Sequence, residues 1–348
     1  MNSQTFEPPG IQDTTLLQIG LAPYILPTLM AADEIGLFAL LARIPLAVAE
    51  IAPELGVSFR GAEAMVATLA SLGLLIPFDG KFHLTDISRT YLVPGKPFYW
   101  GDVLAVWRKV QVTSEGLLTA MRRDTPPPKQ DGTSATIDEW AAAKMTPDRA
   151  LAITRAMHNV SFALGTSVAR TADLSGTRRV LDMAGGSGCY CIAMAQRHPG
   201  IHFTVAELEP VCAVAQQIID QYGLREHIDT LAIDMFRDPW PAGYDAILLN
   251  GVLHDWDKAR RQHLLRRSFE ALPPGGRLLI SEMLLSDSQD GPLGPALLSM
   301  AMTFSGFGKQ FTVREISAEL AEGGFRDISV AQTRAPDFAL VSAVKPNH

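Results

Sequence analysis

The sequence predicts an α/β protein in which a mostly helical first domain, residues 1–172, precedes a doubly wound, Rossmann-like domain, residues 173–348. Three observations carry this prediction. Before residue 172, apolar residues recur three and four positions apart, as in amphipathic helices. From Arg178 onward, apolar strand-like runs alternate with helical segments, as in a parallel sheet covered on both faces. A glycine-rich turn at 185–188 follows the first of these strands.

The composition is that of a chain of about two domains that needs no covalent reinforcement. Of its 348 residues, 47% are hydrophobic and 19% are charged, which suits large apolar cores. Its three cysteines have neither the number nor the spacing of a disulfide framework or a zinc site. No lysine or arginine precedes Arg43, so the basic flank of a secretory signal is missing. We therefore expect a cytoplasmic protein that binds no metal.

The apolar segment 16–32 is expected to pack against a partner and not to enter a membrane. Pro23 and Pro27 interrupt it, and Asp33 and Glu34 follow it, which makes it too short and too broken to span a bilayer. We interpret it as a pair of helices whose apolar surface is covered by a second subunit. The sequence thus predicts a homodimer formed through the N-terminal domain.

A winged helix follows this segment. The order is helix, helix and hairpin, over residues 48–55, 58–72 and 74–84. Gly56 suits the C-cap of the first helix, and Ser58 suits the N-cap of the second. Asp79-Gly80 between the apolar runs of the hairpin is a strong turn signal.

The charge of this module argues against DNA binding. Residues 36–95 carry four basic and five acidic side chains, and the second helix has Arg60 as its only cation, whereas phosphate contacts need several. The whole chain has a formal net charge of −7, which also disfavours a polyanionic partner. The later arginines Arg260, Arg261, Arg266 and Arg267 are expected on the wet face of one helix and not in a nucleic-acid patch.

The second half is predicted in more detail by its alternation. The Pro-rich polar stretch 125–136 is expected to be an exposed loop, and long helices are expected over 137–172. Strands are predicted at 178–184, 201–207, 228–234, 244–251 and 276–285, with helices at 189–198, 210–222 and 258–272. The closing runs 328–330 and 338–344 lack a helix between them and suggest an antiparallel hairpin at the sheet edge.

The glycine turn and the end of the next strand predict a site for adenosine. Gly185, Gly186 and Gly188 stand at the carboxyl end of a strand and before a helix, where open α/β sheets bind ligands. Glu207 ends the next strand, 19 residues beyond Gly188, and a carboxylate there can accept both ribose hydroxyls. A dinucleotide fingerprint would place a third glycine at Cys191, so a pyrophosphate is disfavoured.

A third strand end adds groups suited to an adenine ring. Asp234 can accept from the adenine amino group, while Met235 and Phe236 can stack on the ring. An acidic loop flanked by core residues is the simpler alternative for the same pattern.

His254 lies beyond the fourth strand, and Glu282 ends the fifth. Neighbouring parallel strands share a carboxyl edge, so the imidazole and the carboxylate can meet above the ligand crevice. A carboxylate that accepts from one ring nitrogen leaves the other free to take a proton, which makes a general-base pair. A histidine that caps the next helix is the alternative. Asp255 is expected as a helix cap, and Trp256 as packing for the turn.

The residues named so far resemble the class I S-adenosyl-L-methionine-dependent small-molecule O-methyltransferases of the caffeate and acetylserotonin type, including bacterial members of antibiotic pathways. The resemblance covers nearly the whole chain, from the winged-helix dimerisation module to the final hairpin. It is carried by the motifs LDMAGGSG, DMF, HDW, ALPPGGRLLISE and GKQFT in this order and spacing.

The resemblance implies roles for individual residues. Gly185 and its neighbours would cradle the methionine part of the cofactor, Glu207 would hold the ribose, and His254 would be the base oriented by Glu282. The cofactor-binding residues would be Asp182, Gly185, Gly186, Gly188, Glu207, Leu208, Asp234, Met235, Phe236 and Asn250. The residues lining the cofactor or substrate pocket would include Met157, Ser161 and Trp256, with a packing position on the helix face as the alternative for Met157 and Ser161.

Three positions depart from the family pattern. Ala184 replaces the first of three glycines, and its small side chain is expected to fit. Asn250 stands where plant members have a lysine near the cofactor. Gln310 stands where plant members have a second glutamate beside the catalytic histidine, so the base would face a neutral amide and lose electrostatic support.

The implied reaction transfers a methyl group to the hydroxyl of an aromatic or phenolic small molecule, with S-adenosyl-L-homocysteine as product. Alignment of the nucleophile contributes on the order of 7–11 kcal/mol, and a positioned base about 10²–10⁴-fold. Reaction of the phenolate at a ring carbon, giving C-methylation, is an alternative that Gln310 leaves open. A winged-helix DNA-binding regulator and a nicotinamide oxidoreductase are alternatives of other classes.

Overall fold

The computed structural model describes residues 10–123, 140 and 142–347, and the chain divides into two compact units, Met1–Lys109 and Val110–His348. The expected loop at 125–136 and the start of the predicted helices at 137 lie outside the described residues, except for Trp140. Each unit has its own apolar core.

The boundary between the units lies well before the predicted position at 172. The segment predicted to end the first domain contains α8 (Ser114–Arg123) and α10 (Pro147–Thr171). Helix α10 packs against α11 (Cys189–Ala195) and α12 (Glu209–Gln221) of the sheet domain. Helical periodicity alone does not tell which domain an amphipathic helix covers, and this explains the difference.

The first unit is a helical domain with a two-stranded wing. Its elements are α1 (Thr14–Leu21), η1 (Ala22–Tyr24), α2 (Ile25–Glu34), α3 (Leu37–Arg43), α4 (Val48–Glu54), α5 (Phe59–Ser71), β1 (Leu75–Phe78), β2 (Lys81–Leu84), α6 (Asp86–Tyr91) and α7 (Gly101–Trp107). The predicted winged helix is confirmed. The Ser58 hydroxyl accepts from Gly61 N at 3.1 Å as the N-cap of α5, and Gly56 has φ +65° after α4. The hairpin turns at Asp79-Gly80, where Phe78 pairs with Lys81.

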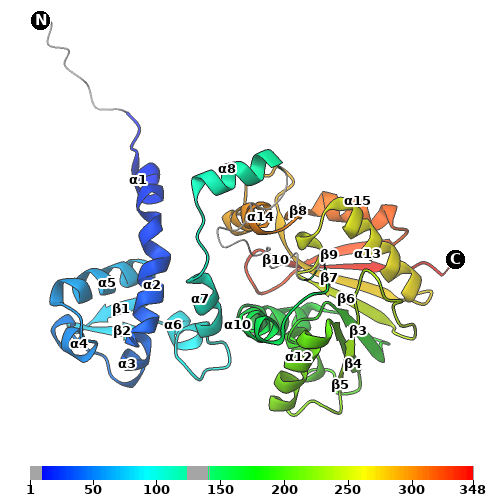
Figure 1. Cartoon of the computed structure of the whole chain (residues 1–348), viewed down its shortest axis with the longest axis horizontal. Coiled ribbons are helices and arrows are strands. Elements are labelled where there is room, and N and C mark those ends of the chain that lie inside the picture. Colours follow the sequence, from blue (N-terminus) through cyan, green and yellow to red (C-terminus); the bar gives the residue numbers. More distant parts are fainter. Residues whose placement is uncertain (1–9, 124–139, 141, 348) are drawn as a thin grey trace, which may run out of the picture. The chain divides into compact units, whose positions relative to one another are not determined.

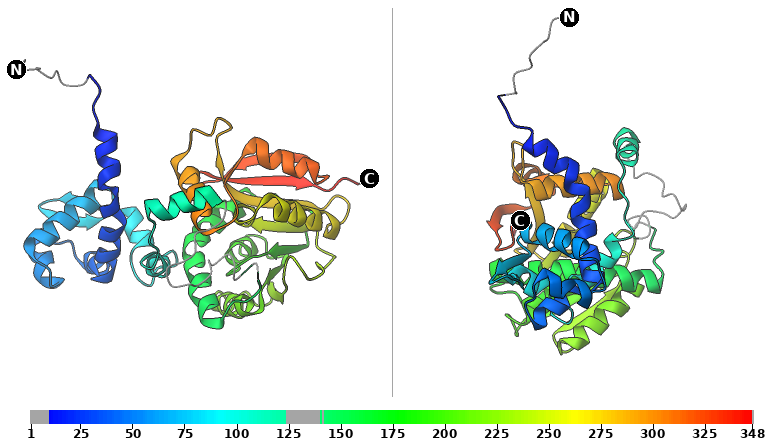
Figure 2. Two further views of the ribbon diagram at one scale, coloured as in Figure 1. Left: turned by 45° about the horizontal axis from the view of Figure 1, so that its top comes forward. Right: turned by 90° about the vertical axis from the view of Figure 1, so that its left-hand side faces the viewer.

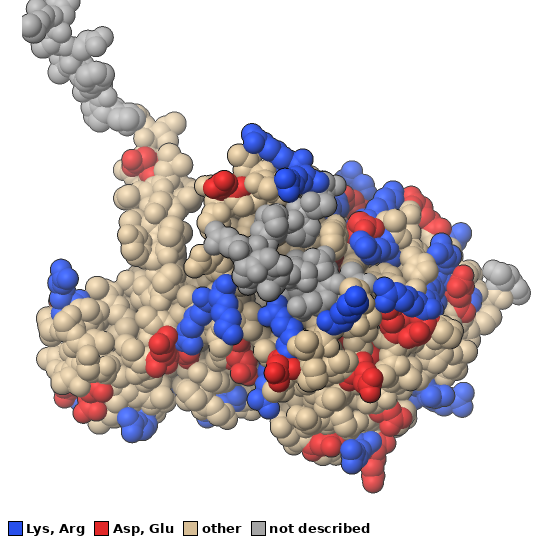
Figure 3. Space-filling view, viewed as in Figure 1, with Lys and Arg blue, Asp and Glu red and all other residues tan. Residues whose placement is uncertain are grey.

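The helices α1 and α2 form an almost continuous helical rod, which we call the N-terminal rod. Pro23 lies in the first turn of η1 and Pro27 in the first turn of α2, where a backbone N–H has no helical partner to lose. The expectation that the segment is too broken to span a bilayer is therefore wrong: Thr14–Glu34 is long and apolar enough by length and composition. In the described part of the chain, no residue of α1 is buried. The ribbon of α1 projects away from the rest of the first unit (Figure 2). On the face in Figure 3 the rod carries few charged side chains.

The second unit is built on one mixed sheet, as predicted. Its strands are β3 (Arg179–Met183), β4 (His202–Glu207), β5 (Ile228–Ala232), β6 (Ala246–Asn250), β7 (Arg277–Leu285), β8 (Phe311–Thr312), β9 (Arg326–Gln332) and β10 (Phe338–Val344). The order is β5-β4-β3-β6-β7-β10-β9, with β8 beside β7. β3 to β7 are parallel, and β9 and β10 form the predicted antiparallel edge hairpin.

The strand order reverses between β3 and β6, which puts the connecting helices on both faces. Helix α12, after β4, and helix α13 (Lys258–Ala271), after β6, lie on opposite sides of the sheet (Figure 1). The remaining elements are η2 (Leu253–Asp255), α14 (Leu293–Ser305) and α15 (Val313–Glu322). A switch point of this kind opens a crevice at the carboxyl ends of the strands, and the candidate residues lie there.

Candidate active site

The turn after β3 is shaped by glycines at which a side chain would either clash or strain the backbone. A Cβ on Gly185 would lie 2.8 Å from the Asp182 carboxylate, and one on Gly188 would lie 3.1 Å from Val205. Gly186 and Gly188 also have φ of +56° and +72°. Ala184 shares this left-handed conformation, with φ +57°, so its replacement of glycine costs conformational strain of about 1–2 kcal/mol. The backbone conformation, and not the small size of the side chain, therefore decides how well alanine replaces glycine at position 184.

A buried carboxylate lies directly under the turn. Asp182 is fully buried; its Oδ2 accepts from the Cys191 thiol at 3.3 Å and its Oδ1 from Asn250 Nδ2 at 3.2 Å. Burial raises the pKa of Asp182 to about 7, and the two hydrogen bonds lower it only in part. The buried Asn250 Oδ1 has no hydrogen-bond partner among the described residues. These buried hydrogen-bond acceptors have no cationic side chain among their described hydrogen-bond donors, so they suit a ligand with a positively charged donor, such as an ammonium group.

A pocket at the ends of β3, β4 and β5 brings together most of the predicted adenosine residues. It is lined by Trp140, Met183, Ala184, Ala206, Glu207, Leu208, Ile233, Asp234, Met235 and Phe236. Glu207 is buried, and its Oε2 accepts from Leu208 N at 2.8 Å. Burial raises the pKa of Glu207 to about 7, while hydrogen bonds from Leu208, Trp140 and Gly186 lower it. The Trp140 side chain thus donates a hydrogen bond to the carboxylate that would accept from the ribose hydroxyls.

Asp234 is already engaged by its own turn. Its Oδ1 accepts from Phe236 N at 2.9 Å, and its Oδ2 pairs with Arg237 at 3.0 Å. Phe236 packs edge-on against Trp256, with ring centroids 4.7 Å apart. Trp256 is only 1% exposed and lies in the core of the second unit, which confirms the packing expected from the residues and corrects the substrate contact that the resemblance implied.

His254 and Glu282 meet as predicted. His254 Nδ1 lies 2.5 Å from Glu282 Oε2, and Glu282 Oε1 accepts from the backbone N–H groups of Leu253 and His254 at 3.1 and 3.3 Å. The carboxylate therefore holds both the ring and the turn that carries it. Since an ionised carboxylate only accepts, Nδ1 keeps its proton toward Glu282, and Nε2 is the nitrogen that loses or takes the second proton. Asp255 Oδ1 lies 3.6 Å from Nε2.

The charges around His254 outweigh its burial. Burial by itself lowers the pKa of the imidazole, but the negative charges of Glu282 and Asp255 and the hydrogen bond to Glu282 raise it to about 9. A positively charged ligand beside the ring would act against these carboxylates and lower the pKa again.

The segment 306–310 lies on the backbone of the His254 turn. Phe307 N donates to Asp255 O at 3.3 Å, and a Cβ on Gly308 would lie 1.9 Å from His254 O. Only glycine fits at 308, which explains the first letter of the GKQFT motif. Gln310 follows, with its backbone N–H on Ser299 Oγ at 3.3 Å. Its side chain is 1% exposed, and neither amide atom has a partner among the described residues.

Helix α10 brings a residue to the glycine turn that sequence reasoning missed. Met157 and Ser161 both lie on α10, Met157 being 43% exposed, and neither lines the described pocket. Between them in sequence, His158 is buried and its Nδ1 lies 3.0 Å from Ser187 Oγ of the turn. Burial lowers the pKa of His158 to about 4, so the ring is neutral at physiological pH. Its place between the two predicted residues in RAMHNVS was the available signal.

The doubly wound sheet, the glycine turn with an acidic residue on the next strand, and the His–Glu pair at one edge are those of the Rossmann-like methyltransferase class. Among the described residues no group of three or more His, Cys, Asp and Glu side chains could hold a metal ion. The chain belongs to the O-methyltransferase family. The O-methyltransferase domain matches residues 119–326, and the O-methyltransferase dimerisation domain matches residues 22–94.

Similar proteins agree along nearly the whole chain. The 3-hydroxy-5-methyl-1-naphthoate 3-O-methyltransferase of Streptomyces sahachiroi is 35% identical, covering 97% of each chain. Bovine acetylserotonin O-methyltransferase is 32% identical over 88% of this chain and 90% of its own. The crystal structure of human N-acetylserotonin methyltransferase in complex with SAM is 29% identical, with a TM-score of 0.83, and covers 98% of this chain and 100% of that one. The protein is an S-adenosylmethionine-dependent O-methyltransferase of small molecules, which confirms the predicted family, fold class and enzyme class.

Proposed function

We propose that the enzyme methylates a phenolic hydroxyl of an aromatic small molecule, with His254 as general base and Glu282 as its orienting partner. The observation that carries this proposal is the 2.5 Å contact between His254 Nδ1 and the fully buried Glu282. In the unprotonated ring this contact makes Nε2 the proton acceptor, in a turn that is fixed by two further hydrogen bonds to the same carboxylate.

The chain offers groups that match each part of the cofactor. Glu207 would accept from the ribose hydroxyls, and Met235 and Phe236, which line the same pocket, would contact the adenine. The Asp182–Asn250 pair, with its unpartnered acceptor, suits the methionine ammonium group. When bound, S-adenosylmethionine supplies an electrophilic sulfonium methyl group. The remaining tasks, removal of the acceptor proton and alignment of the oxygen, belong to the protein.

Gln310 is proposed to contact the acceptor. A buried amide without a partner costs about 1–3 kcal/mol, which a polar group of the acceptor would recover. Because the amide is neutral, His254 has Glu282 and Asp255 as its nearby carboxylates, and Gln310 adds no third negative charge.

We expect S-adenosylhomocysteine release only with acceptors that have a free phenolic hydroxyl. The test incubates the purified chain with S-adenosylmethionine and a panel of one- and two-ring phenols, each paired with its own methyl ether. Product NMR then separates transfer to oxygen from transfer to a ring carbon. Turnover of the ethers at the rate of the phenols, or of amines alone, would contradict the proposal.

We also propose that the enzyme is a homodimer in which a second subunit covers the N-terminal rod. The rod exposes Leu16, Leu17 and Tyr24 by 60–72%, and the dimerisation domain match begins within it at residue 22. Light scattering on the full chain is expected to give twice the chain mass of 37.7 kDa. The double substitution Leu16→Lys with Leu17→Lys should shift the mass toward the monomer. A monomeric wild type at micromolar concentration would sink this idea.

A further inference from the structure

Arg261 does not lie on the wet face of α13, contrary to the prediction from the sequence. Its side chain is only 7% exposed, whereas Arg266 on the same helix is exposed. A buried guanidinium is tolerated only when its charge and its donors are met. The partners that meet them show what the residue holds together.

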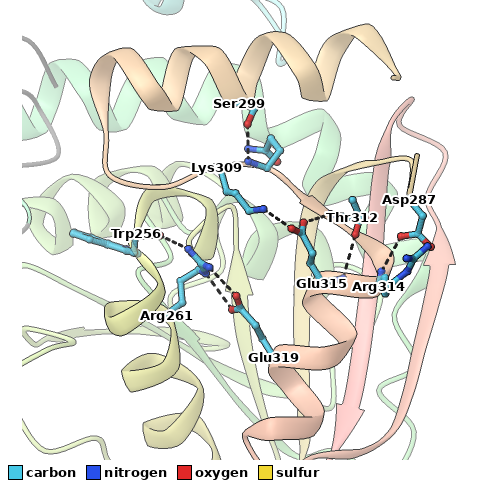
Figure 4. A network of polar contacts seen from close by, with 10 residues as sticks. Trp256, Arg261, Asp287, Ser299, Lys309, Thr312, Arg314, Glu315 and Glu319 are labelled. Carbon is cyan, nitrogen blue, oxygen red and sulfur yellow. Dashed lines mark hydrogen bonds and ion pairs between the residues drawn. The ribbon is translucent and has the colours of Figure 1, made fainter. Parts of the chain in front are cut away.

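Arg261 joins the His254 turn to α15 (Figure 4). Its Nη1 donates to the carbonyl of Trp256 at 2.8 Å, at the end of the turn. Its Nε and Nη2 form a two-pronged pair with Glu319 at 3.1 and 2.7 Å. Glu319 is itself only 13% exposed, so solvent screens this pair little.

The same guanidinium also reaches the segment that carries Gln310. Its Cζ lies 4.9 Å from the centroid of the Phe311 ring, a cation–π distance. Phe311 follows Gln310 directly, and Gly308 already touches the His254 carbonyl. Arg261 therefore contacts both sides of the interface between the His254 turn and the Gln310 segment.

We propose that Arg261, paired with Glu319, is a positioning residue that fixes the His254 turn relative to the Gln310 segment. The inference rests on the proposed role of His254 as base. Arg261 itself is assigned no contact with cofactor or acceptor. We call the Arg261–Glu319 pair the clamp. Since a displacement of about 1 Å at a reacting group can cost about 100-fold in rate, loss of the clamp should lower turnover and not cofactor affinity.

The test removes the pair without leaving a buried charge. The double substitution Arg261→Met with Glu319→Leu replaces both charged groups by apolar ones, which buried pairs often tolerate. The matched control is Arg314→Met, which breaks the exposed Arg314–Asp287 pair of the same network at the start of α15. Thermal unfolding and calorimetric titration with S-adenosylhomocysteine are measured for each variant.

For the double variant we expect cofactor affinity within about twofold of wild type and kcat lower by about 10- to 100-fold. The control variant Arg314→Met should keep the wild-type cofactor affinity and the wild-type kcat. A second readout needs no turnover: histidine NMR titration of the free enzyme, with the His254 signal assigned by its loss in His254→Ala. The groups that face His254 are Glu282 from β7 and Asp255 from η2. If the turn is less fixed, these two carboxylates stabilise the protonated ring less, so the His254 pKa should fall.

The outcomes separate this inference from the proposed function. An unchanged kcat and an unchanged His254 titration in the folded double variant overturn the positioning role, and so does an equal loss of turnover and cofactor affinity. If His254→Ala itself keeps full activity, the proposed base is wrong while the NMR shift still reports on the clamp. If His254→Ala loses activity and the double variant does not, the proposed function stands and the clamp falls.

Discussion

Replacing His254 by alanine is expected to lower kcat by about 10²–10⁴-fold while S-adenosylhomocysteine binds as tightly as to wild type. The size is that of a positioned general base, because no other imidazole is held by Glu282 at this edge of the sheet in the described part of the chain. Single-turnover methyl transfer with a phenolic acceptor measures the chemical step, and calorimetry measures the binding. His202→Ala, which removes an exposed imidazole at the start of β4, serves as the control with unchanged kcat.

The pH dependence tests the same assignment. The unprotonated ring is the active form, and the neighbouring carboxylates raise its pKa to about 9, so kcat/KM should rise with pH toward that value. Glu282→Gln removes one negative charge while keeping an acceptor oxygen, so the inflection should move to lower pH. An inflection that stays in place in Glu282→Gln, or a His254→Ala variant with more than a tenth of the wild-type kcat, would remove His254 from the role of base.

The sheet and the site edge could be predicted because they follow from local patterns. Apolar strands that alternate with helices specify a parallel sheet, and each predicted residue at a strand end is carried to the same edge by that topology. Glu207 and His254 were found in this way. The predicted winged helix likewise rests on caps and on a turn signal that act within a few residues.

Other parts of the site depend on contacts between distant segments and were missed. The polar spacing along α13 predicts Arg261 on the wet face, yet its partners lie 5 and 58 residues away. His158 meets Ser187 from another helix, and Trp140 meets Glu207. Periodicity describes one element at a time, so it does not report a charge that is buried by pairing with another element.

Trp256 and Ala184 show where a family motif and side-chain size, respectively, mislead the assignment of a residue. The family resemblance implies Trp256 for the substrate pocket, but the structure buries it in the core, in agreement with the packing role expected from the residues alone. The small size of Ala184 suggests an easy fit, whereas its left-handed backbone is what distinguishes it from glycine. A motif identifies the region of the fold in which a site lies. The backbone conformation and burial of each residue decide whether that residue contacts a ligand or supports the site by packing.

Glu207→Ala is expected to weaken S-adenosylhomocysteine binding by at least about 100-fold. Two hydrogen bonds from ribose hydroxyls to a buried carboxylate are worth about 1.5–3 kcal/mol each, and about 3 kcal/mol in total already corresponds to that factor. Before binding, Glu207 accepts from the Trp140 side chain, so the ribose must replace this bond. Calorimetric titration of wild type and variant measures the difference.

The protonation of Glu207 gives this prediction a second, signed test. Burial raises its pKa to about 7, and the ionised form accepts both hydroxyls, so wild-type affinity should fall as the pH is lowered from 8 to 6. Glu207→Gln has no such proton to gain, and it isolates this effect from Asp182, whose pKa is also raised to about 7. If the affinity of Glu207→Ala stays within threefold of wild type, the ribose is held elsewhere and the adenosine assignment of this pocket fails. If only the pH dependence is absent, Glu207 binds the ribose but is ionised throughout this range, which would place the ribose hydroxyls or a backbone N–H close enough to offset its burial.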